Sequence, residues 1–363
     1  DAIEDINYLP YMSWREWIKT LGNYNIGVHL MRTHAAGTFA MNCAWHGIPC
    51  VGYKGLDTQE ILHPLTTVEV GDLDEAVRVA KNRKSLETKL VKSRRISIMD
   101  IGIVGIGIVG GAIKHGLKKL GHKIIVHDIK LKTKIGDVVN ADIVFICVPT
   151  PSTPNGDCDT SVVESVISEL SNLEYKGVVC IKSTVKPGTT KKLSKDFPTL
   201  NLSFVPEFLR ERCAISDFIE NHDLCVIGTD SKKTFDLIKK VHGKYPKNIV
   251  QLSVTEAEFV KYFSNTYNAM LITFANNFYE ICKKMGVDYT NVKNAVVRGS
   301  HINDQYLDCN DNFRGYGGVC LPKDIKAISN LAEELGLKGK IFKTIIEDNG
   351  KYKTTVFNGM REE

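Results

Sequence analysis

The sequence lacks the features of several protein classes. No apolar run approaches the roughly 18 residues that a membrane-spanning helix requires, and no secretory signal peptide is visible. The ten cysteines include no C-x-x-C pair and no cysteine–histidine spacing that suits zinc. Scattered cysteines are typical of a reducing compartment. We therefore expect a cytoplasmic protein without a bound metal.

A strong charge imbalance is also missing. The net charge is +5 over 363 residues, and much of the excess lies in KNRKSLETKLVKSRR (81–95). Such a run is more often a solvated helix or linker than a binding patch, so we expect no nucleic-acid partner. With 43% apolar residues, the chain is long enough for two or three domains whose cores need no disulfides.

The character of the chain changes near residue 95. Before it, residues 29–64 read as a glycine turn, a helix over 36–46, the short strand IPCVG and a polar loop. We predict four parts: a partial α/β segment (1–94), a dinucleotide-binding domain (95–251), a helical domain (252–349) and a polar tail (350–363).

A dinucleotide-binding turn follows at IGIVGIGIVGG (101–111), with G-x-G-x-x-G at Gly105, Gly107 and Gly110. An apolar strand precedes it and a helix ending near Gly121 follows it, which is the context that the motif requires. A second strand ends on Asp128, where a carboxylate accepts hydrogen bonds from the adenosine ribose. That favours NAD over NADP, although Lys130 is close by.

Polar residues follow the next two strands of the predicted sheet. Only twelve residues separate Asp128 from the buried strand ADIVFICVP (141–149), so the crossover is short. The end of that strand places Thr150 on the nicotinamide side. Strand 177–185 delivers Lys182, Ser183 and Thr184 to the same edge, which is the ligand-binding edge of an open parallel sheet.

Two glutamates stand four residues apart in FVPEFLRER (204–212). Glu207 and Glu211 share one face if the segment is helical after Pro206. The alternative is two solvated glutamates paired with Arg210 or Arg212.

Residues 253–286 form the clearest predicted helix. Thr255 and Glu258 fit a capping box, and Gly286 fits the C-terminal end. A core face is predicted from apolar residues at helical spacing, namely Phe259, Phe263, Tyr267, Met270 and Phe274. On another face, Lys261 and Asn265 are neighbours that can both donate to an oxyanion, unless they are simply solvated.

The stretch GGVCLPKD (317–324) precedes another predicted helix, with Pro322 suited to its first turn. Cys320 is either a small residue at a loop-to-helix junction or a thiol presented for chemistry. The helix N-terminus and Lys323 should favour the thiolate. Asp324 is one turn away, within reach of a water or a transferred proton.

Four motifs in order resemble the UDP-glucose/GDP-mannose dehydrogenase family over about residues 99–335: KSTVKPGTT, VPEFLRE, EFVKYFSNTYNAM and GYGGVCLPKD. The resemblance implies an α/β fold, a Rossmann-like doubly wound parallel sheet joined by a long helix to an all-α domain. It implies a homodimer through the helix over 255–285. It also implies a nucleotide-sugar substrate, a UDP- or GDP-hexose, whose C6 alcohol is oxidised to a carboxylate by two NAD molecules in succession.

The resemblance also implies residue roles. Cys320 traps the aldehyde as a thiohemiacetal, which is oxidised to a thioester and hydrolysed. The implied catalytic residues are Cys320, Lys261, Asn265, Asp324, Glu207 and Thr184. Those implied for the cofactor are Gly105, Gly107, Gly110, Asp128, Lys130, Thr150, Thr184, Glu211 and Lys323. Those implied for the substrate are Phe208, Leu209, Lys261, Asn265, Phe313, Gly317 and His301.

The match departs from the family in three places. The segment after Asp128 is short, His301 stands where the family commonly has an arginine, and no third α/β domain that grips the nucleotide base precedes Glu363. Both the sugar and the base stay open.

Residues 20–85 loosely resemble the nucleotide-sugar half of a glycosyltransferase, either as a remnant or as a functional fusion. Two other functions remain as alternatives. One is a two-electron dehydrogenase of the 3-hydroxyacid type, which needs no cysteine. The other is an inactive nucleotide-binding fragment.

Overall fold

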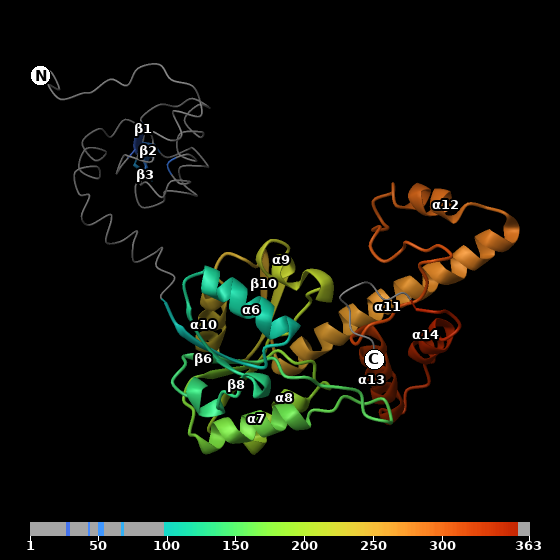
Figure 1. Cartoon of the computed structure of the whole chain (residues 1–363). Helices are drawn as coiled ribbons and strands as arrows, with labels where there is room; N and C mark the ends of the chain where they lie inside the picture. Colours follow the sequence, from blue (N-terminus) through green and yellow to red (C-terminus); the bar gives the residue numbers. More distant parts are fainter. Residues whose placement is uncertain (1–26, 30–42, 44–49, 54–66, 69–97, 355–363) are drawn as a thin grey trace, which may run out of the picture. The chain divides into compact units, whose positions relative to one another are not determined.

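The structure is a computed structural model that describes residues 27–29, 43, 50–53, 67–68 and 98–354 (Figure 1). The chain separates into two compact units, Asp1–Arg95 and Ile96–Glu363. Within the described residues, no helix is long and apolar enough to cross a membrane.

The described residues of the first unit include three short parallel strands: β1 (Gly27–His29), β2 (Cys50–Tyr53) and β3 (Thr67–Val68). Cys43 is helical and buried. The glycine turn and the rest of the predicted helix over 36–46 lie outside the described residues. The resemblance to a glycosyltransferase half stays a prediction.

The second unit is built on a seven-stranded sheet in the order β10-β9-β8-β7-β6-β4-β5. Its strands are β4 (Asp100–Val104), β5 (Lys123–His127), β6 (Ile143–Ile146), β7 (Val178–Ile181), β8 (Asn201–Phe204), β9 (Leu224–Gly228) and β10 (Asn248–Leu252). Pairing is parallel except between β8 and β9, where Phe204 pairs with Gly228 in the antiparallel sense. The doubly wound Rossmann-like sheet is therefore confirmed, with an antiparallel step before its last two strands.

Helices cover both faces of this sheet (Figure 1). One face carries α6 (Ile108–Lys119), α9 (Ala214–Ile219) and α10 (Lys232–His242), and the other carries α7 (Ser161–Asn172) and α8 (Thr189–Asp196). Strand residues alternate between the two layers, so that Ile143 and Phe145 pack with one helix layer while Val144 and Ile146 pack with the other. Both faces are buried, which explains the continuous apolar runs of the central strands.

The connection from β5 to β6 contains no α-helix. Two short 3₁₀ helices, η2 (Ile129–Leu131) and η3 (Ile135–Val138), make the crossover instead. Val138 is fully buried between this connection and the sheet. The short crossover expected from the sequence is confirmed.

The long predicted helix is α11 (Val254–Met285), which ends at Gly286 in the left-handed conformation. Its capping box is formed by Ser253 and Glu256 rather than by Thr255 and Glu258, so that prediction was wrong by two residues. Both pairs have the same spacing. Only the structure shows that Glu258 is fully buried and forms its hydrogen bonds with residues outside α11.

The predicted core face of α11 is wrong for its four aromatic residues, whereas Met270 packs against the small core that α11 forms with the C-terminal helices. Its aromatic residues are largely exposed, with exposed fractions of 44% for Phe259, 76% for Phe263, 49% for Tyr267 and 55% for Phe274. Helical periodicity identifies an apolar stripe but not what covers it.

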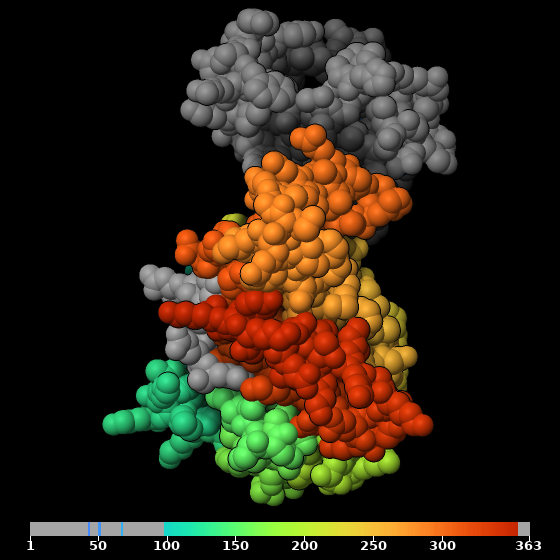
Figure 2. Space-filling view, turned by 90° about the vertical axis from the view of Figure 1, so that its right-hand side faces the viewer, coloured from blue at the N-terminus to red at the C-terminus, as the bar shows by residue number. Residues whose placement is uncertain are grey.

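The remaining helices are α12 (Tyr289–Val296), α13 (Leu321–Glu334) and α14 (Ile341–Asn349). Helices α13 and α14 pack against each other and against α11, where Ala269, Tyr316, Ile325 and Ile345 form a small core. Figure 2 shows this face, with the red C-terminal helices lying along the orange α11. Helix α13 thus lies beside the half of α11 that leaves the sheet (Figure 1).

Candidate active site

The glycine turn lies at the C-terminal end of β4, whose neighbours β5 and β6 pair on opposite sides. Gly105 has a φ of +89°, and a Cβ there would lie 2.8 Å from the carbonyl oxygen of Cys147. A Cβ on Gly110 would lie 2.0 Å from the carbonyl oxygen of Gly105. Both positions therefore require glycine. The turn lies at the switch point of the sheet, where such folds bind ligands.

Gly107 differs from these two glycines because it faces open space. It is the N-cap of α6, and a Cβ on it would meet no atom within 4 Å. The N–H groups of the first helical turn are directed here, which suits an anionic pyrophosphate. A groove of about 1200 Å³ opens beside Gly107 and is also lined by Glu211 and Arg212. Glu211 thus lies in the same groove as the glycine turn, and its role at the cofactor stays a prediction.

Asp128 follows β5 and faces the glycine turn. Its Oδ2 accepts a hydrogen bond from the Ile106 N–H at 2.7 Å, and its Oδ1 accepts one from the Lys130 N–H at 2.8 Å. These backbone donors lower the pKa of Asp128, so the carboxylate is ionised and available as an acceptor. The Lys130 side chain is exposed.

The residues present fit a dinucleotide. The cradle is formed by three glycines, two of which tolerate no Cβ, and the carboxylate of Asp128 is fixed at the end of the adjacent strand. NAD, when bound, supplies the hydride acceptor. The glycine turn would hold its pyrophosphate, and Asp128 its adenosine ribose.

A buried ion pair connects the strand ends. Lys182, directly after β7, donates from Nζ to Glu207 Oε2 at 2.8 Å, and the two side chains are 1% and 7% exposed. Burial opposes both charges, but Glu207 raises the pKa of Lys182 and Lys182 lowers the pKa of Glu207. Glu207 Oε1 accepts a hydrogen bond from the Phe208 N–H. The carboxylate is therefore fixed as an anion.

Glu207 and Glu211 do not share a helical face. Residues 205–210 have no regular secondary structure, a 3₁₀ turn starts only at Glu211, and α9 follows from Ala214. The alternative of two solvated glutamates fails too, since Glu207 is buried. Arg210 pairs with Asp217 on α9, with 2.7 Å between Nη2 and Oδ1.

Lys261 on α11 is buried and points at the same strand end. Its Nζ donates to the backbone carbonyl of Glu207 at 2.6 Å and lies 5.6 Å from the centre of the Phe208 ring. The structure therefore joins three of the predicted residues in one contact. The solvated alternative for Lys261 is wrong.

Asn265, one turn further along α11, reaches α13. Its Nδ2 donates to Asp324 Oδ2 at 2.5 Å, and Lys323 Nζ donates to Asp324 Oδ1 at 2.5 Å. All three side chains are buried, and Asp324 is fully so. Burial alone lowers the pKa of Lys323, but Asp324 raises it above its usual range. The amide, the carboxylate and the ammonium form one fixed cluster.

Cys320 is the N-cap of α13, with Pro322 in the first turn, as the sequence predicts. Its carbonyl accepts the Asp324 N–H at 3.0 Å. The cysteine is exposed, but desolvation by the surrounding protein raises the pKa of its thiol, and Lys261 and Lys323 only partly offset this. The prediction that the resting site favours the thiolate was wrong, because desolvation outweighs the nearby positive charges.

The other predicted residues divide into two groups. Near the strand ends lie Thr150, Thr184 and Leu209, all half-buried, and just upstream of Cys320 lie Phe313 and Gly317. His301 is exposed in the segment after α12, and within the described part of the chain no hydrogen bond or ion pair joins it to this site. The role of His301 in substrate binding therefore stays a prediction.

Sequence reasoning missed two groups at the site. Cys158 donates from Sγ to the Thr184 carbonyl at 3.1 Å; burial raises its pKa, and the charge of Lys323 opposes this. Glu258 on α11 accepts the N–H groups of Gly188 and Thr190 at the start of α8. No motif marks Cys158. The spacing of Glu258 from Thr255 predicted a cap for its own helix, α11, whereas Glu258 caps the start of α8.

Metal-ligand geometry gives no further site. In residues 98–354 and the short described segments before them, no group of three or more His, Cys, Asp or Glu side chains is arranged to hold a metal ion.

Comparison with known proteins places this geometry in a family. Residues 130–245 match the NAD binding domain of the UDP-glucose/GDP-mannose dehydrogenase family, and residues 255–351 match its central domain. The chain is 32% identical to a UDP-glucose 6-dehydrogenase of Rickettsia bellii, over 59% of this chain and 50% of that protein. It is also 32% identical to a GDP-mannose 6-dehydrogenase of Pseudomonas aeruginosa, over 61% of this chain and 53% of that protein.

A UDP-glucose dehydrogenase structure from the archaeon Pyrobaculum islandicum shares the fold, with a TM-score of 0.66 and 27% identity over 71% of this chain and 69% of that one. The chain spans about half the length of the curated relatives it matches. Two successive family domains match more than half of the chain, and the observed fold agrees with them. This chain belongs to the UDP-glucose/GDP-mannose dehydrogenase family.

Proposed function

We propose that the chain is an NAD-dependent nucleotide-sugar 6-dehydrogenase. It oxidises the C6 alcohol of a UDP- or GDP-hexose to a carboxylate through a covalent cysteine adduct. Residues 95–251 act as the NAD-binding domain and residues 252–349 as the helical domain. The observation that carries the proposal is the position of Cys320 at the N-terminus of α13, next to the buried cluster in which Asp324 accepts from Asn265 and Lys323.

The chemistry needs two oxidations at one carbon. In the first, C6 loses a hydride to NAD⁺ and its hydroxyl loses a proton to a base, which leaves an aldehyde. The Cys320 sulfur then adds to the carbonyl carbon while its S–H proton passes to a neighbouring carboxylate and the carbonyl oxygen takes up a proton, so that a thiohemiacetal forms. Loss of a second hydride to a second NAD⁺, with loss of the hydroxyl proton, converts this adduct to a thioester, which water hydrolyses to the carboxylate and the free thiol.

Buried donors support the oxyanions of these steps. Lys261 and Asn265 lie one helical turn apart, and their protons are directed at the Glu207 carbonyl and Asp324 in the free protein. A substrate oxygen can replace these acceptors with little reorganisation, because both side chains are already fixed. Asp324 or Glu207 accepts the protons, and Thr184 positions the water.

The raised thiol pKa fits a nucleophile that loses its proton only when the aldehyde is present. Desolvation keeps Cys320 protonated at rest, which limits its oxidation. The proton leaves when the aldehyde arrives and a neighbouring carboxylate can accept it.

We further propose a homodimer built through α11. The exposed apolar residues of this helix are Phe259, Phe263, Tyr267, Phe274, Phe278, Ile281 and Met285. They follow one stripe of a 32-residue helix, whereas soluble monomers rarely expose such a contiguous apolar face. A second copy of the same helix covers it. The exposed His301 then serves the substrate of the partner chain.

The cytoplasm is the proposed location. The ten cysteines are scattered along the sequence without paired spacing, as expected of a reducing compartment.

One experiment tests the function. The protein is incubated with NAD and a panel of UDP- and GDP-sugars, and NADH is followed at 340 nm beside a Cys320→Ser control. We expect slow NADH formation from one sugar, and from the serine variant only trapped substrate or no reaction. Steady turnover by Cys320→Ser would contradict the role of the cysteine. One NADH per substrate would favour the two-electron dehydrogenase. Tight NAD binding without any NADH formation would favour the inactive nucleotide-binding fragment.

A further inference from the structure

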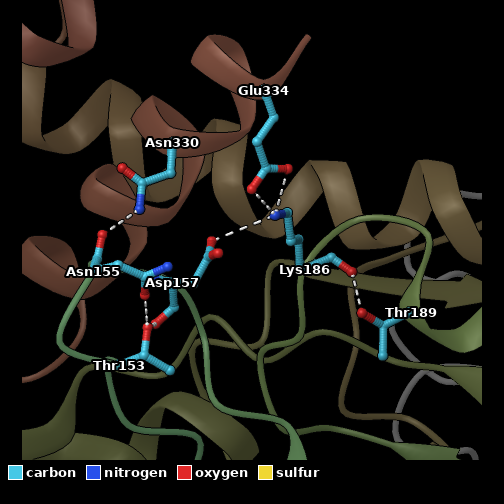
Figure 3. Close-up of polar contacts among 7 residues, drawn as sticks. All are labelled: Thr153, Asn155, Asp157, Lys186, Thr189, Asn330 and Glu334. Atoms are coloured by element: carbon cyan, nitrogen blue, oxygen red, sulfur yellow. Dashed lines mark hydrogen bonds and ion pairs between the residues drawn. The ribbon is translucent and has the colours of Figure 1, made fainter.

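Two loops of the Rossmann-like domain reach across to the C-terminal half of α13 (Figure 3). Lys186, in the loop after β7, lies with its Nζ 2.7 Å from both carboxylate oxygens of Glu334 and 3.4 Å from Asp157 Oδ1. Asn330 Nδ2 donates to the carbonyl of Asn155 at 2.6 Å. Asn155 and Asp157 both belong to the loop after β6. We call these five residues the α13 clamp.

Hydrogen bonds of the following residues fix the backbone at Lys186. The Thr189 hydroxyl donates to the Lys186 carbonyl at 2.6 Å. Glu258, fully buried on α11, accepts the N–H groups of Gly188 at 2.5 Å and Thr190 at 2.8 Å. The backbone position of Lys186 is therefore fixed, although its side chain is long.

The other loop is shaped for close approach to α13. The Thr153 N–H donates to the Asp157 carbonyl, and the Gly156 N–H donates to the Thr153 carbonyl, both at 2.8 Å. Gly156 has a φ of +87°, and a Cβ there would lie 3.2 Å from Asn330 Nδ2. A side chain at position 156 would therefore crowd the Asn330 amide and would have to adopt the left-handed backbone conformation.

The clamp and the thiol lie at opposite ends of one rigid element. Helix α13 has 14 residues, about 20 Å in length, and Cys320 is its N-cap. Near the cysteine the helix is tied to α11 through Asp324 and Asn265. At the far end it is tied to the Rossmann-like domain through Asn330 and Glu334. Packing on α11 and α14 holds the middle of the helix, and the clamp adds a direct attachment of its far end to the Rossmann-like domain.

The loops that grip the helix also carry predicted cofactor and catalytic residues. Thr150 precedes the clamp segment of one loop, and Thr184 lies two residues before Lys186 in the other. Cys158 bonds one loop to the other through the Thr184 carbonyl. A displacement of the loops relative to α13 therefore changes the distance between these residues and Cys320.

The clamp contributes little to the stability of the fold. The side chains of Lys186, Asp157 and Glu334 are 26%, 22% and 51% exposed. Pairs with this exposure typically contribute at most about 1 kcal/mol and weaken in salt. A contact of this strength can be made and broken during turnover, whereas the buried Lys182–Glu207 pair cannot.

We propose that Lys186 is a positioning residue: through Glu334 and Asp157 it sets the orientation of α13, and so the placement of Cys320 against the cofactor-binding loops. This inference rests on the proposed function. Lys186 itself touches neither the thiol nor the glycine turn. Its loss is expected to affect the chemical steps rather than cofactor affinity.

The test compares Lys186→Met with Lys186→Arg and with Lys232→Met. Lys232 pairs with Asp236 on the outer helix α10, also exposed, and serves as the matched control. For Lys186→Met we expect kcat to fall about 10-fold while KM for NAD changes less than about twofold, because misplacement of about 1 Å weakens catalysis strongly. Lys186→Arg should restore kcat. The wild-type rate should fall in high salt, and that of Lys186→Met should not.

A second measurement does not need an active enzyme. Amide hydrogen exchange of the full chain should become about fivefold faster in residues 321–326 of Lys186→Met, as well as in the two loops. Faster exchange in the loops alone, with no change next to Cys320, would overturn the inference whether or not the protein oxidises a sugar. An unchanged kcat in an active Lys186→Met variant would also overturn it. Inactivity of the wild type with altered exchange at 321–326 would support the positioning role and contradict the proposed activity.

Discussion

Removal of the Lys182 ammonium should strongly destabilise the protein. Lys182 is 1% exposed and lies 2.8 Å from Glu207 Oε2, so Lys182→Met leaves a buried carboxylate without its cation. Breaking a buried pair in this way costs about 3–5 kcal/mol of unfolding free energy. Urea unfolding at pH 7, followed by far-UV circular dichroism, measures the loss.

The free energy of unfolding should depend on pH in opposite directions in the wild type and in Lys182→Met. In the wild type Lys182 lowers the pKa of Glu207. The pair therefore stabilises the protein above the usual carboxyl pKa, and this stability is lost as the pH falls through the lowered pKa. In Lys182→Met, burial without a cation raises the pKa of Glu207. The variant should therefore recover part of its loss as the pH falls from 7 toward 5.

Two controls complete the experiment. Lys247→Met removes an exposed partner of Asp223 and should change the free energy of unfolding by less than about 1 kcal/mol. Lys182→Met/Glu207→Leu removes both charges and should be more stable than Lys182→Met alone. A loss in Lys182→Met no larger than in Lys247→Met would refute the account of a buried, mutually stabilising pair.

Three further predictions use other parts of the structure. Burial lowers the pKa of His242 to about 3, from a usual 6.5, so stability should fall as the pH falls between these values. At pH 5 the loss is about 2 kcal/mol, and His242→Leu should flatten this dependence in urea titrations; an unchanged slope would contradict it. Gly110→Ala should lower the thermal midpoint because its Cβ meets the Gly105 carbonyl, whereas Gly107→Ala should keep the midpoint and weaken NAD binding in calorimetry at least about 10-fold. Equal effects of the two would be inconsistent with their different surroundings. Phe263→Glu, at a residue 76% exposed, should shift the proposed dimer to monomer in sedimentation velocity, and a wild type that is already monomeric would rule out the α11 interface.

The sequence could predict the elements whose signals are local. The glycine turn, Asp128 at the end of β5, Gly286 after α11 and Pro322 at the start of α13 each depend on a few neighbouring residues, and each lies where expected. Spacing on one helix also predicted that Lys261 and Asn265 act on the same side. These features need no knowledge of what packs against them.

The sequence could not predict features that depend on distant partners. Glu258 has the spacing of a cap residue, but the backbone of α8 captures it, so Ser253 and Glu256 cap α11 instead. The aromatic stripe of α11 has the periodicity of a core, yet it is exposed because nothing in the described chain covers it. The thiol pKa of Cys320 rises because desolvation, invisible in the sequence, outweighs Lys261 and Lys323.

The measurement that tests the central claim most directly is the ratio of NADH formed to nucleotide sugar consumed at completion. It is obtained by absorbance and mass spectrometry on the same sample. A cysteine-dependent four-electron oxidation predicts two NADH for each sugar, with the uronate as the product and a thioester mass on the Cys320 peptide during turnover. One NADH per sugar with an aldehyde or ketone product, and no adduct on Cys320, would contradict the account.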